Sequence, residues 1–218
     1  MHLGNIIIID GVSNSGKTTL CKTLTKDENN VLIEEVPLFI KNHKELFMGK
    51  ELPGIPKNKE EEIANQRFLL EAELERVKLA YYIIKSGKNA ILDRSFLSTV
   101  SVAYSLDDNS LFGGIYINSV KLLREYYHFI NDLQLNECIK YIFLITDPNM
   151  VKKRNETREK TLSDDWISPK LMNMQNSFFV SQSNSCNAKL IDTTDLTLEE
   201  VLNRLLEVTK KRTSGKSQ

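Results

Sequence analysis

Residues 11–18 of the 218-residue sequence read Gly-Val-Ser-Asn-Ser-Gly-Lys-Thr, and this segment restricts the possible folds more than any other. It follows the β-branched run Ile6–Ile9, which is typical of a buried strand, and it leads into Thr18–Leu24, which begins like a helix. Glycines allow backbone conformations that other residues avoid, so successive N–H groups can turn inward around an anion. The start of the helix adds unsatisfied N–H groups and the positive end of the helix dipole. We therefore expect a phosphate-binding loop between a strand and a helix.

In a loop of this pattern the lysine reaches the β- and γ-phosphates of a nucleotide, and the hydroxyl that follows it binds Mg²⁺. These residues are Lys17 and Thr18. A chance match in a turn rich in glycine and serine would lack the flanking strand and helix. The residues expected to bind the cofactor ATP are Gly11, Ser13, Asn14, Ser15, Gly16, Lys17, Thr18 and Thr19.

Short apolar segments alternate with helical ones along the chain. The expected strands are 5–10, 31–35, 89–93, 140–146 and 188–192. The expected helices are 18–25, 60–85, 96–105, 117–133, 148–159, 168–184 and 198–210. Strands that are apolar throughout are typical of parallel strands covered on both faces. The alternation therefore predicts an α/β fold, a three-layer α/β/α sandwich with a five-stranded parallel sheet, whose ligands bind at one edge.

Length and composition limit the number of domains and the partners. The length fits a single domain, residues 1–210, followed by a polar tail, 211–218. Lys+Arg and Asp+Glu both number 29, and this zero net charge argues against a general nucleic-acid binder, which usually carries a basic excess. No apolar run is long enough to cross a bilayer. The first strand begins too early to leave room for a signal peptide, so we expect a cytoplasmic protein.

The strand 89–93 ends in Asp93 and is followed directly by Arg94 and Ser95. An aspartate at the end of an apolar strand beside a phosphate loop can hold Mg²⁺ directly or through water. An arginine in the same crevice can clamp a phosphate by paired hydrogen bonds. The alternative is that Asp93 or Ser95 caps the next helix while Arg94 lies in solvent. Because the phosphate loop is present, we favour the catalytic interpretation.

Two carboxylates, Glu34 and Glu35, lie at the end of the expected strand 31–35. A carboxylate at this edge of the sheet can accept the proton of an attacking hydroxyl as a general base. Because side chains alternate between the two faces of a strand, only one of the two is expected to face the site. Ordinary solvated acids are the alternative.

A basic segment, 152–160, follows the fourth expected strand. Arg154 and Arg158 are four residues apart and so share one face of a helix. Two arginines that close over a triphosphate would neutralise the charge that develops during phosphoryl transfer. We therefore predict a lid over about residues 152–168, with a solvated helix face as the alternative.

These residues resemble the thymidylate kinase and deoxynucleoside kinase superfamily over residues 5–206. The resemblance implies a P-loop NTPase fold with a helical lid, use of ATP and Mg²⁺, and a homodimer. Asp93-Arg94-Ser95 is similar to Asp-Arg-Tyr of thymidylate kinases and to Glu-Arg-Ser of deoxynucleoside kinases. Glu34-Glu35-Val36 is similar to Glu-Pro-Val of deoxynucleoside kinases, whose Glu is the base for the 5′-hydroxyl. That similarity implies this role for Glu34, although the proline is absent.

Three residues are candidates for contact with the acceptor. The segment 69–76 resembles the substrate-side helix of thymidylate kinases, which implies that Arg76 contacts an acceptor phosphate. Gln66 has the amide needed to read a base edge, and Tyr104 has a ring that can stack on a base. A solvated position for Gln66 and a core position for Tyr104 are the alternatives.

We therefore expect an ATP-dependent kinase that moves the γ-phosphate to a (deoxy)nucleoside or a nucleoside monophosphate. The expected catalytic residues are Lys17, Glu34, Asp93, Arg94, Arg154 and Arg158, and the metal ligands are Thr18 and Asp93. A hydroxyl acceptor needs a base such as Glu34, whereas a phosphate acceptor is already ionised and needs a cation such as Arg76. The agreement of Glu34 with Arg94-Ser95 favours the nucleoside.

Three alternatives remain at the level of sequence. One is a kinase of another small hydroxyl compound, and another is a regulator that binds ATP without turnover. A small GTPase is disfavoured, because the nearest candidate for its guanine-reading motif, Asn58-Lys59-Glu60-Glu61, lacks the required aspartate.

Overall fold

Five parallel strands form a single sheet in the order β2-β3-β1-β4-β5. The computed structural model describes residues 3–54, 56–106 and 113–210, and the side chains of 206–210 are outside the description. The strands are β1 (Ile6–Gly11), β2 (Asn30–Ile33), β3 (Asn89–Asp93), β4 (Ile139–Ile145) and β5 (Lys189–Asp192). The predicted five-stranded parallel sheet is confirmed.

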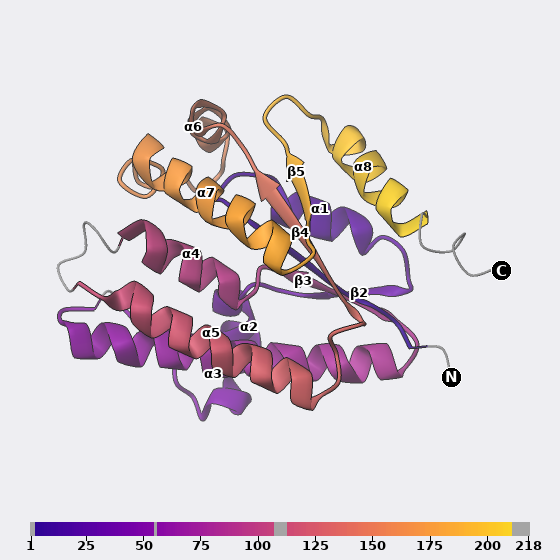
Figure 1. Cartoon of the computed structure of the whole chain (residues 1–218), viewed down its shortest axis with the longest axis horizontal. Coiled ribbons are helices and arrows are strands. Elements are labelled where there is room, and N and C mark those ends of the chain that lie inside the picture. Colours follow the sequence, from indigo (N-terminus) through magenta and orange to yellow (C-terminus); the bar gives the residue numbers. More distant parts are fainter. Residues whose placement is uncertain (1–2, 55, 107–112, 211–218) are drawn as a thin grey trace.

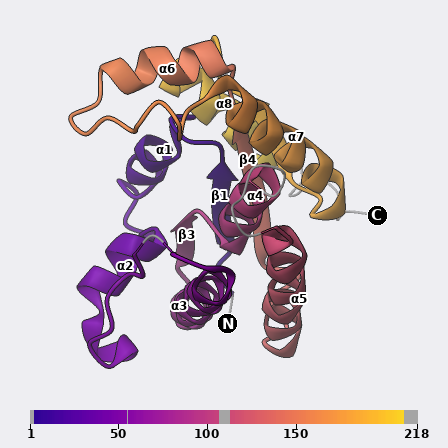
Figure 2. The same ribbon diagram turned by 90° about the vertical axis from the view of Figure 1, so that its left-hand side faces the viewer.

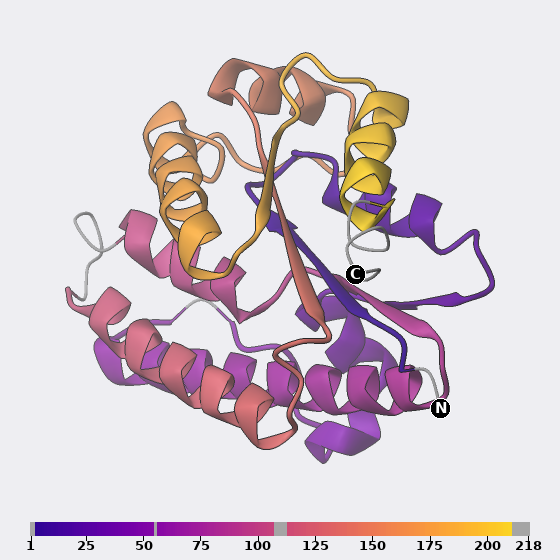
Figure 3. The same ribbon diagram turned by 45° about the vertical axis from the view of Figure 1, so that its right-hand side comes forward.

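Helices cover both faces of this sheet, so the predicted three-layer sandwich is also confirmed (Figure 1). The helices are α1 (Lys17–Leu24), α2 (Val36–Asn42), α3 (Lys59–Lys85), α4 (Phe96–Leu106), α5 (Ile115–Asp132), α6 (Pro148–Glu156), α7 (Pro169–Ser185) and α8 (Leu198–Lys210). The layer of α3, α4, α5 and α7 is opposite the layer of α1 and α8 (Figure 3). Among the described residues, none of the helices combines the length and apolarity that a membrane span requires. The predicted tail, 211–218, lies outside the described residues.

Alternation along the strands divides the core into two clusters. Ile8 and Leu92 are buried in the larger cluster, under α3, α4, α5 and α7. Ile9 and Ile91, their neighbours in sequence, are buried in the smaller cluster, under α1 and α8. Strands of this kind have no polar face, which explains the continuous apolar runs in the sequence.

The segment after β2 differs from the expectation. Helix α2 begins at Val36 with a proline in its first turn, where the missing N–H of proline costs nothing. A short 3₁₀ helix, η1 (Lys44–Phe47), follows. Phe39 of α2 and Phe47 of η1 are buried, with ring centroids 6.1 Å apart. This apolar pair packs the segment between β2 and α3, for which we expected no helix before residue 60, against the rest of the domain.

Gly11, at the end of β1, lies too close to β4 for a side chain. Its φ is +133°, and a Cβ at this position would lie 2.0 Å from the backbone oxygen of Leu144. Gly16 has a similar φ of +96°, but a Cβ there would meet nothing within 4 Å. A substitution at either glycine would strain the backbone, but only a substitution at Gly11 would also cause steric overlap.

We predict that Gly11→Ala lowers the free energy of unfolding by about 3–5 kcal/mol, the sum of backbone strain and overpacking. Gly16→Ala should lower it by only about 1–2 kcal/mol, the cost of the left-handed backbone alone. Urea unfolding followed by circular dichroism measures both. Equal losses for the two variants would contradict the close approach of Gly11 to β4.

Candidate active site

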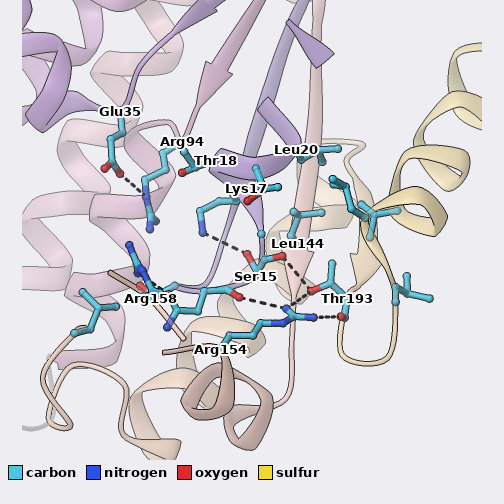
Figure 4. A pocket seen from close by; sticks show the side chains of 18 of the residues that line it. Ser15, Lys17, Thr18, Leu20, Glu35, Arg94, Leu144, Arg154, Arg158 and Thr193 are labelled. Carbon is cyan, nitrogen blue, oxygen red and sulfur yellow. Dashed lines mark hydrogen bonds and ion pairs between the residues drawn. The ribbon is translucent and has the colours of Figure 1, made fainter. Parts of the chain in front are cut away.

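A cleft of about 570 Å³ opens at the carboxyl edge of the sheet (Figure 4). The loop between β1 and α1 forms its floor, and Glu35 and Arg94 stand on one side of it. Helix α6 and the chain that follows it lie over the start of α1 (Figure 2). The residues that line the cleft beyond the loop include Leu144, Arg154, Arg158, Leu162, Trp166, Thr193, Leu196, Leu198 and Val201.

The loop has the backbone shape that an anion site needs. Asn14 and Gly16 both have positive φ, at +57° and +96°. The Oγ of Ser15 donates to the carbonyl of Val12 over 2.9 Å, which closes the loop on itself. Ser13, Asn14, Ser15, Gly16, Lys17, Thr18 and Thr19 line the cleft, whereas Gly11 lies at the end of β1. The sequence-predicted nucleotide residues are thus brought together around one concave surface.

Lys17 is buried at the bottom of the loop. Its ammonium donates to the carbonyl of Val12 and, over 3.3 Å, to the Oγ of Ser15. Burial lowers the pKa of this lysine to about 7, and the neighbouring guanidinium of Arg94 acts in the same direction. An anionic phosphate would favour the protonated form, so binding of a phosphate and protonation of Lys17 are coupled.

Thr18 and Asp93 meet as the sequence predicts. The hydroxyl of Thr18 donates to Oδ2 of Asp93 over 2.7 Å. The other oxygen, Oδ1, is buried and has no hydrogen-bond partner among the described residues. The part of the chain that is described contains no group of three or more His, Cys, Asp or Glu side chains that could hold a metal ion. One carboxylate and one hydroxyl suit Mg²⁺, which usually takes its remaining ligands from water and from substrate phosphates.

Arg94 is fixed in a strained backbone conformation, with φ at +69°. Its Nε donates to Oε2 of Glu35 over 3.1 Å, and its Nη1 donates to the Oγ of Ser98 over 3.0 Å. Positive φ at a residue other than glycine costs of order 1–3 kcal/mol and is found mainly at functional sites. The side chain of Arg94 is thereby aimed into the cleft beside Lys17 (Figure 4).

A buried carboxylate supports this arrangement from below. Asp10, fully buried, accepts from the Oγ of Ser98 over 2.5 Å. It also accepts from the backbone N–H and the Oγ of Ser95, at 2.9 and 2.7 Å, and from the N–H of Gly11 at 2.8 Å. Asp10 therefore connects the phosphate loop to the start of α4 and, through Ser98, to Arg94. Neither Asp10, at the end of the expected strand 5–10, nor Ser98, in the expected helix 96–105, was among the predicted site residues.

Of the two carboxylates after β2, Glu35 faces the cleft and Glu34 does not line it. Glu34 instead accepts from the Nδ2 of Asn42, the last residue of α2, over 3.3 Å. The sequence-based choice of Glu34 over Glu35 is therefore not supported by the geometry. The carboxylate within reach of the site is that of Glu35, paired with Arg94.

Arg76 does not reach the cleft. It is fully buried, its Nη1 is paired with Glu73, and its Nη2 donates to the carbonyl of Asp93 over 2.8 Å. Nη2 is also 3.3 Å from the carbonyl of Arg94 and 3.5 Å from that of Ile33. Burial raises the pKa of the Glu73 carboxyl to about 7, although Arg76 acts in the opposite direction. The arginine predicted to contact an acceptor phosphate therefore holds the ends of β2 and β3 together.

The other two acceptor candidates are also engaged with the protein. Gln66 is buried, and its Oε1 accepts from the Nδ2 of Asn118 over 2.7 Å. The ring of Tyr104 lies 5.2 Å from that of Tyr116 and 5.8 Å from that of Phe178, measured between centroids. Neither of them is among the residues that line the cleft.

The two predicted lid arginines differ in their surroundings. Arg154 is partly buried and donates to the oxygens of Thr193, with Nη2 2.6 Å from the carbonyl. Arg158 is exposed and donates to the Oδ1 of Asn14 over 2.6 Å. Both line the cleft, as predicted. Thr193, which follows the expected strand 188–192, was not among the predicted site residues.

Comparison with known proteins agrees with this geometry. The model of the family described as deoxynucleoside kinase matches residues 7–212. A thymidylate kinase from Buchnera aphidicola subsp. Baizongia pistaciae is 32% identical over 110 residues, which are 46% of this chain and 50% of that protein. The chain thus spans about half the length of this curated relative.

Solved structures show the same fold. Thymidylate kinase from Candida albicans superposes with a TM-score of 0.64 at 17% identity, over 97% of this chain and 93% of that one. Deoxyadenosine kinase from M. mycoides superposes with a TM-score of 0.61 at 16% identity, over 94% of this chain and 99% of that one. At these identities the likeness establishes the fold alone.

The lowered pKa of Lys17 gives a prediction about pH. Because bound phosphate raises this pKa from about 7, ATP binding at pH 8 should take up nearly one proton, and affinity should fall as the pH rises above 7. Below pH 6 the lysine is already protonated in the free protein, so uptake should vanish. Titration calorimetry in buffers of different ionisation enthalpy measures the uptake.

The matched control is Lys17→Arg, whose guanidinium stays charged throughout this range. Any ATP binding that this variant retains should show no proton uptake at pH 8. Equal uptake by the variant and the natural protein would assign the titration to another group.

Proposed function

The chain belongs to the deoxynucleoside kinase family, and we propose that it transfers the γ-phosphate of Mg-ATP to a hydroxyl of a (deoxy)nucleoside. One observation carries the choice of acceptor. The Glu35 carboxylate stands in the cleft beside Arg94, whereas the guanidinium of Arg76 is fully buried under the strand ends. A base is therefore available for a hydroxyl, and the cation that the sequence offered for an acceptor phosphate is not.

Three charged residues of the cleft have distinct roles in this reaction. Glu35 accepts the proton of the attacking hydroxyl, because a hydroxyl is a weak nucleophile until it is deprotonated. Arg94, held against Glu35, faces the transferring phosphoryl group. Lys17 lies at the bottom of the same loop and stabilises charge on the β- and γ-phosphates. The phosphoryl group needs little further chemistry, since positioning and electrostatic stabilisation supply most of the catalysis in phosphoryl transfer.

Thr18 and Asp93 would hold the Mg²⁺ ion of the nucleotide, which when bound neutralises negative charge on the triphosphate. The unpaired Oδ1 of Asp93 supports this assignment, because a buried carboxylate oxygen without a donor is costly unless it has a ligand. Use of a purine triphosphate is supported by a structural neighbour, the M. mycoides deoxyadenosine kinase with bound dATP, which covers 93% of this chain at a TM-score of 0.57.

A nucleoside monophosphate is the second candidate acceptor. It is favoured by the 32% identity to a thymidylate kinase over about half of each chain. An acceptor phosphate would have to be bound by a cation other than Arg76. The two candidates are therefore distinguished by which carboxylate or cation the reaction requires.

We predict that Glu35→Gln lowers kcat by about 10²–10⁴-fold, the usual contribution of a general base, with little change in the affinity for ATP. The amide keeps the shape of the side chain and an oxygen for Arg94. Steady-state kinetics with a deoxynucleoside acceptor measures the effect.

Glu34→Gln is the matched control, one residue away at a side chain that does not line the cleft. It should keep kcat within about threefold, since surface changes away from a site have small effects. A larger loss for Glu34→Gln than for Glu35→Gln would restore the sequence-based assignment and contradict the one made from the geometry.

A further inference from the structure

The segment 148–168, which we call the lid, is docked on the phosphate loop by bonds between protein atoms. Four of these bonds involve Asn14. Its Nδ2 donates to the carbonyl of Val151 and to the Oδ1 of Asn155, both over 3.3 Å. Its Oδ1 accepts from Arg158 over 2.6 Å, and its backbone carbonyl accepts from Arg154 over 3.2 Å. One residue of the loop thus meets both arginines of the lid, Arg158 through its side chain and Arg154 through its backbone carbonyl.

Asn155 fixes the shape of the lid itself. Its side chain, 6% exposed, donates to the carbonyl of Leu162 over 3.0 Å and accepts from the N–H of the same residue over 2.9 Å. This pair of bonds folds the chain after α6 back onto the helix. The backbone N–H of Arg158 also bonds to the carbonyl of Asn155 over 3.2 Å. Arg158 therefore lies in a turn that Asn155 bonds on both sides, at Arg158 itself and at Leu162.

The backbone of Asn14 supports a specific role for this residue type. Its φ of +57° is left-handed, a conformation that asparagine adopts more readily than most residues with a side chain. Glycine would fit the backbone but would offer neither the donor nor the acceptor. The position therefore combines the conformation of the loop with the attachment of the lid.

Arg154 and Arg158 are held in different ways. Arg154 ties α6 to the loop and to β5, since its guanidinium donates to Asn14, Thr146 and Thr193. Arg158 has the Oδ1 of Asn14 as its bonded acceptor and is otherwise exposed in the cleft. An amide oxygen competes weakly with a phosphate oxygen for a guanidinium, so Arg158 can pass from the amide to a nucleotide without moving the lid.

We propose that Asn14 and Asn155 are positioning residues that dock the lid and deliver Arg158 to the phosphate site before a nucleotide arrives. The inference rests on the proposed function only in that Arg158 is taken to serve phosphoryl transfer. Preorganised charge of this kind avoids the cost of ordering the lid in each catalytic cycle.

Trp166 provides a direct reporter. It is the only tryptophan in the sequence, and it lines the cleft together with Leu162 and Arg158. Asn155→Leu keeps the size of the side chain but removes its hydrogen bonds. In the free protein this change should raise the acrylamide quenching constant of Trp166 at least about twofold, as the lid loses two or three hydrogen bonds. Saturating Mg-ATP should return the constant towards that of the natural protein.

Two variants serve as controls. Asn155→Asp keeps the oxygen that accepts from Leu162 and Asn14 but loses the donor to the Leu162 carbonyl, so its quenching constant should lie between those of the natural protein and Asn155→Leu. Thr157→Ala removes a hydroxyl that bonds to the carbonyl of Arg154 inside the lid, and it should leave quenching unchanged. If Asn155→Leu does not fold, Asn14→Ala should produce the same rise in quenching from the other side of the contact.

The KM for ATP of Asn155→Leu should rise about 3- to 10-fold, with a smaller change in kcat, because docking is lost before chemistry begins. The proposal would be overturned if the quenching constants of Asn155→Leu and Asn14→Ala equalled that of the natural protein. It would also be overturned if Thr157→Ala raised the constant as much as Asn155→Leu does. The quenching experiment requires no acceptor and no turnover. A failure to phosphorylate nucleosides would therefore contradict the proposed function without affecting the test of lid docking.

Discussion

The buried guanidinium of Arg76 donates hydrogen bonds to backbone carbonyls at the ends of β2 and β3. The positions of Glu35, Asp93 and Arg94 in the site depend on these bonds. Asp93 and Arg94 carry two of these carbonyls, and Glu35 lies two residues beyond the third, at Ile33. Glu73 balances the charge of Arg76 inside the core. Removing one partner of such a buried pair costs about 3–5 kcal/mol, whereas the pair as a whole adds little to stability. Its value here is geometric, because it fixes two strand ends relative to each other.

Hydrogen bonds stabilise the two residues of the site whose backbone is strained. Arg94 and Asn14 both have positive φ, and both are held by several hydrogen bonds. Arg94 is fixed by Glu35 and by Ser98, which rests on the buried Asp10. Asn14 is fixed by the lid. The loop, the strand ends and the lid are thus each held by contacts between protein atoms, so that their donors are in position when phosphate binds.

The fold and the phosphate loop could be predicted because their signals are local. Continuous apolar strands and the spacing of glycine, lysine and threonine depend on a few neighbouring residues. The choice between Glu34 and Glu35 was also made from local signals, and the geometry of the cleft favours Glu35 instead. That choice applied strand alternation and family resemblance to residues beyond the strand, since β2 ends at Ile33 and Glu35 is the residue before α2.

Other features required tertiary contacts that no spacing reveals. Whether an arginine on α3 enters the cleft or lies beneath it depends on how the helix packs against β2 and β3, and Arg76 does the latter. The bond between Asn14 and Asn155 joins residues 141 positions apart. Neither residue belongs to a pattern that predicts the other, so the attachment of the lid became visible only in the structure.

The central claim is that the cleft serves a hydroxyl acceptor, and an acceptor screen tests it most directly. ADP release from Mg-ATP would be measured with deoxynucleosides, ribonucleosides and their monophosphates under identical conditions. The account predicts turnover with at least one nucleoside and none with the matching monophosphate, because Glu35 is in the cleft and Arg76 is not. Turnover with monophosphates alone would contradict it and would require another cation to bind the acceptor phosphate.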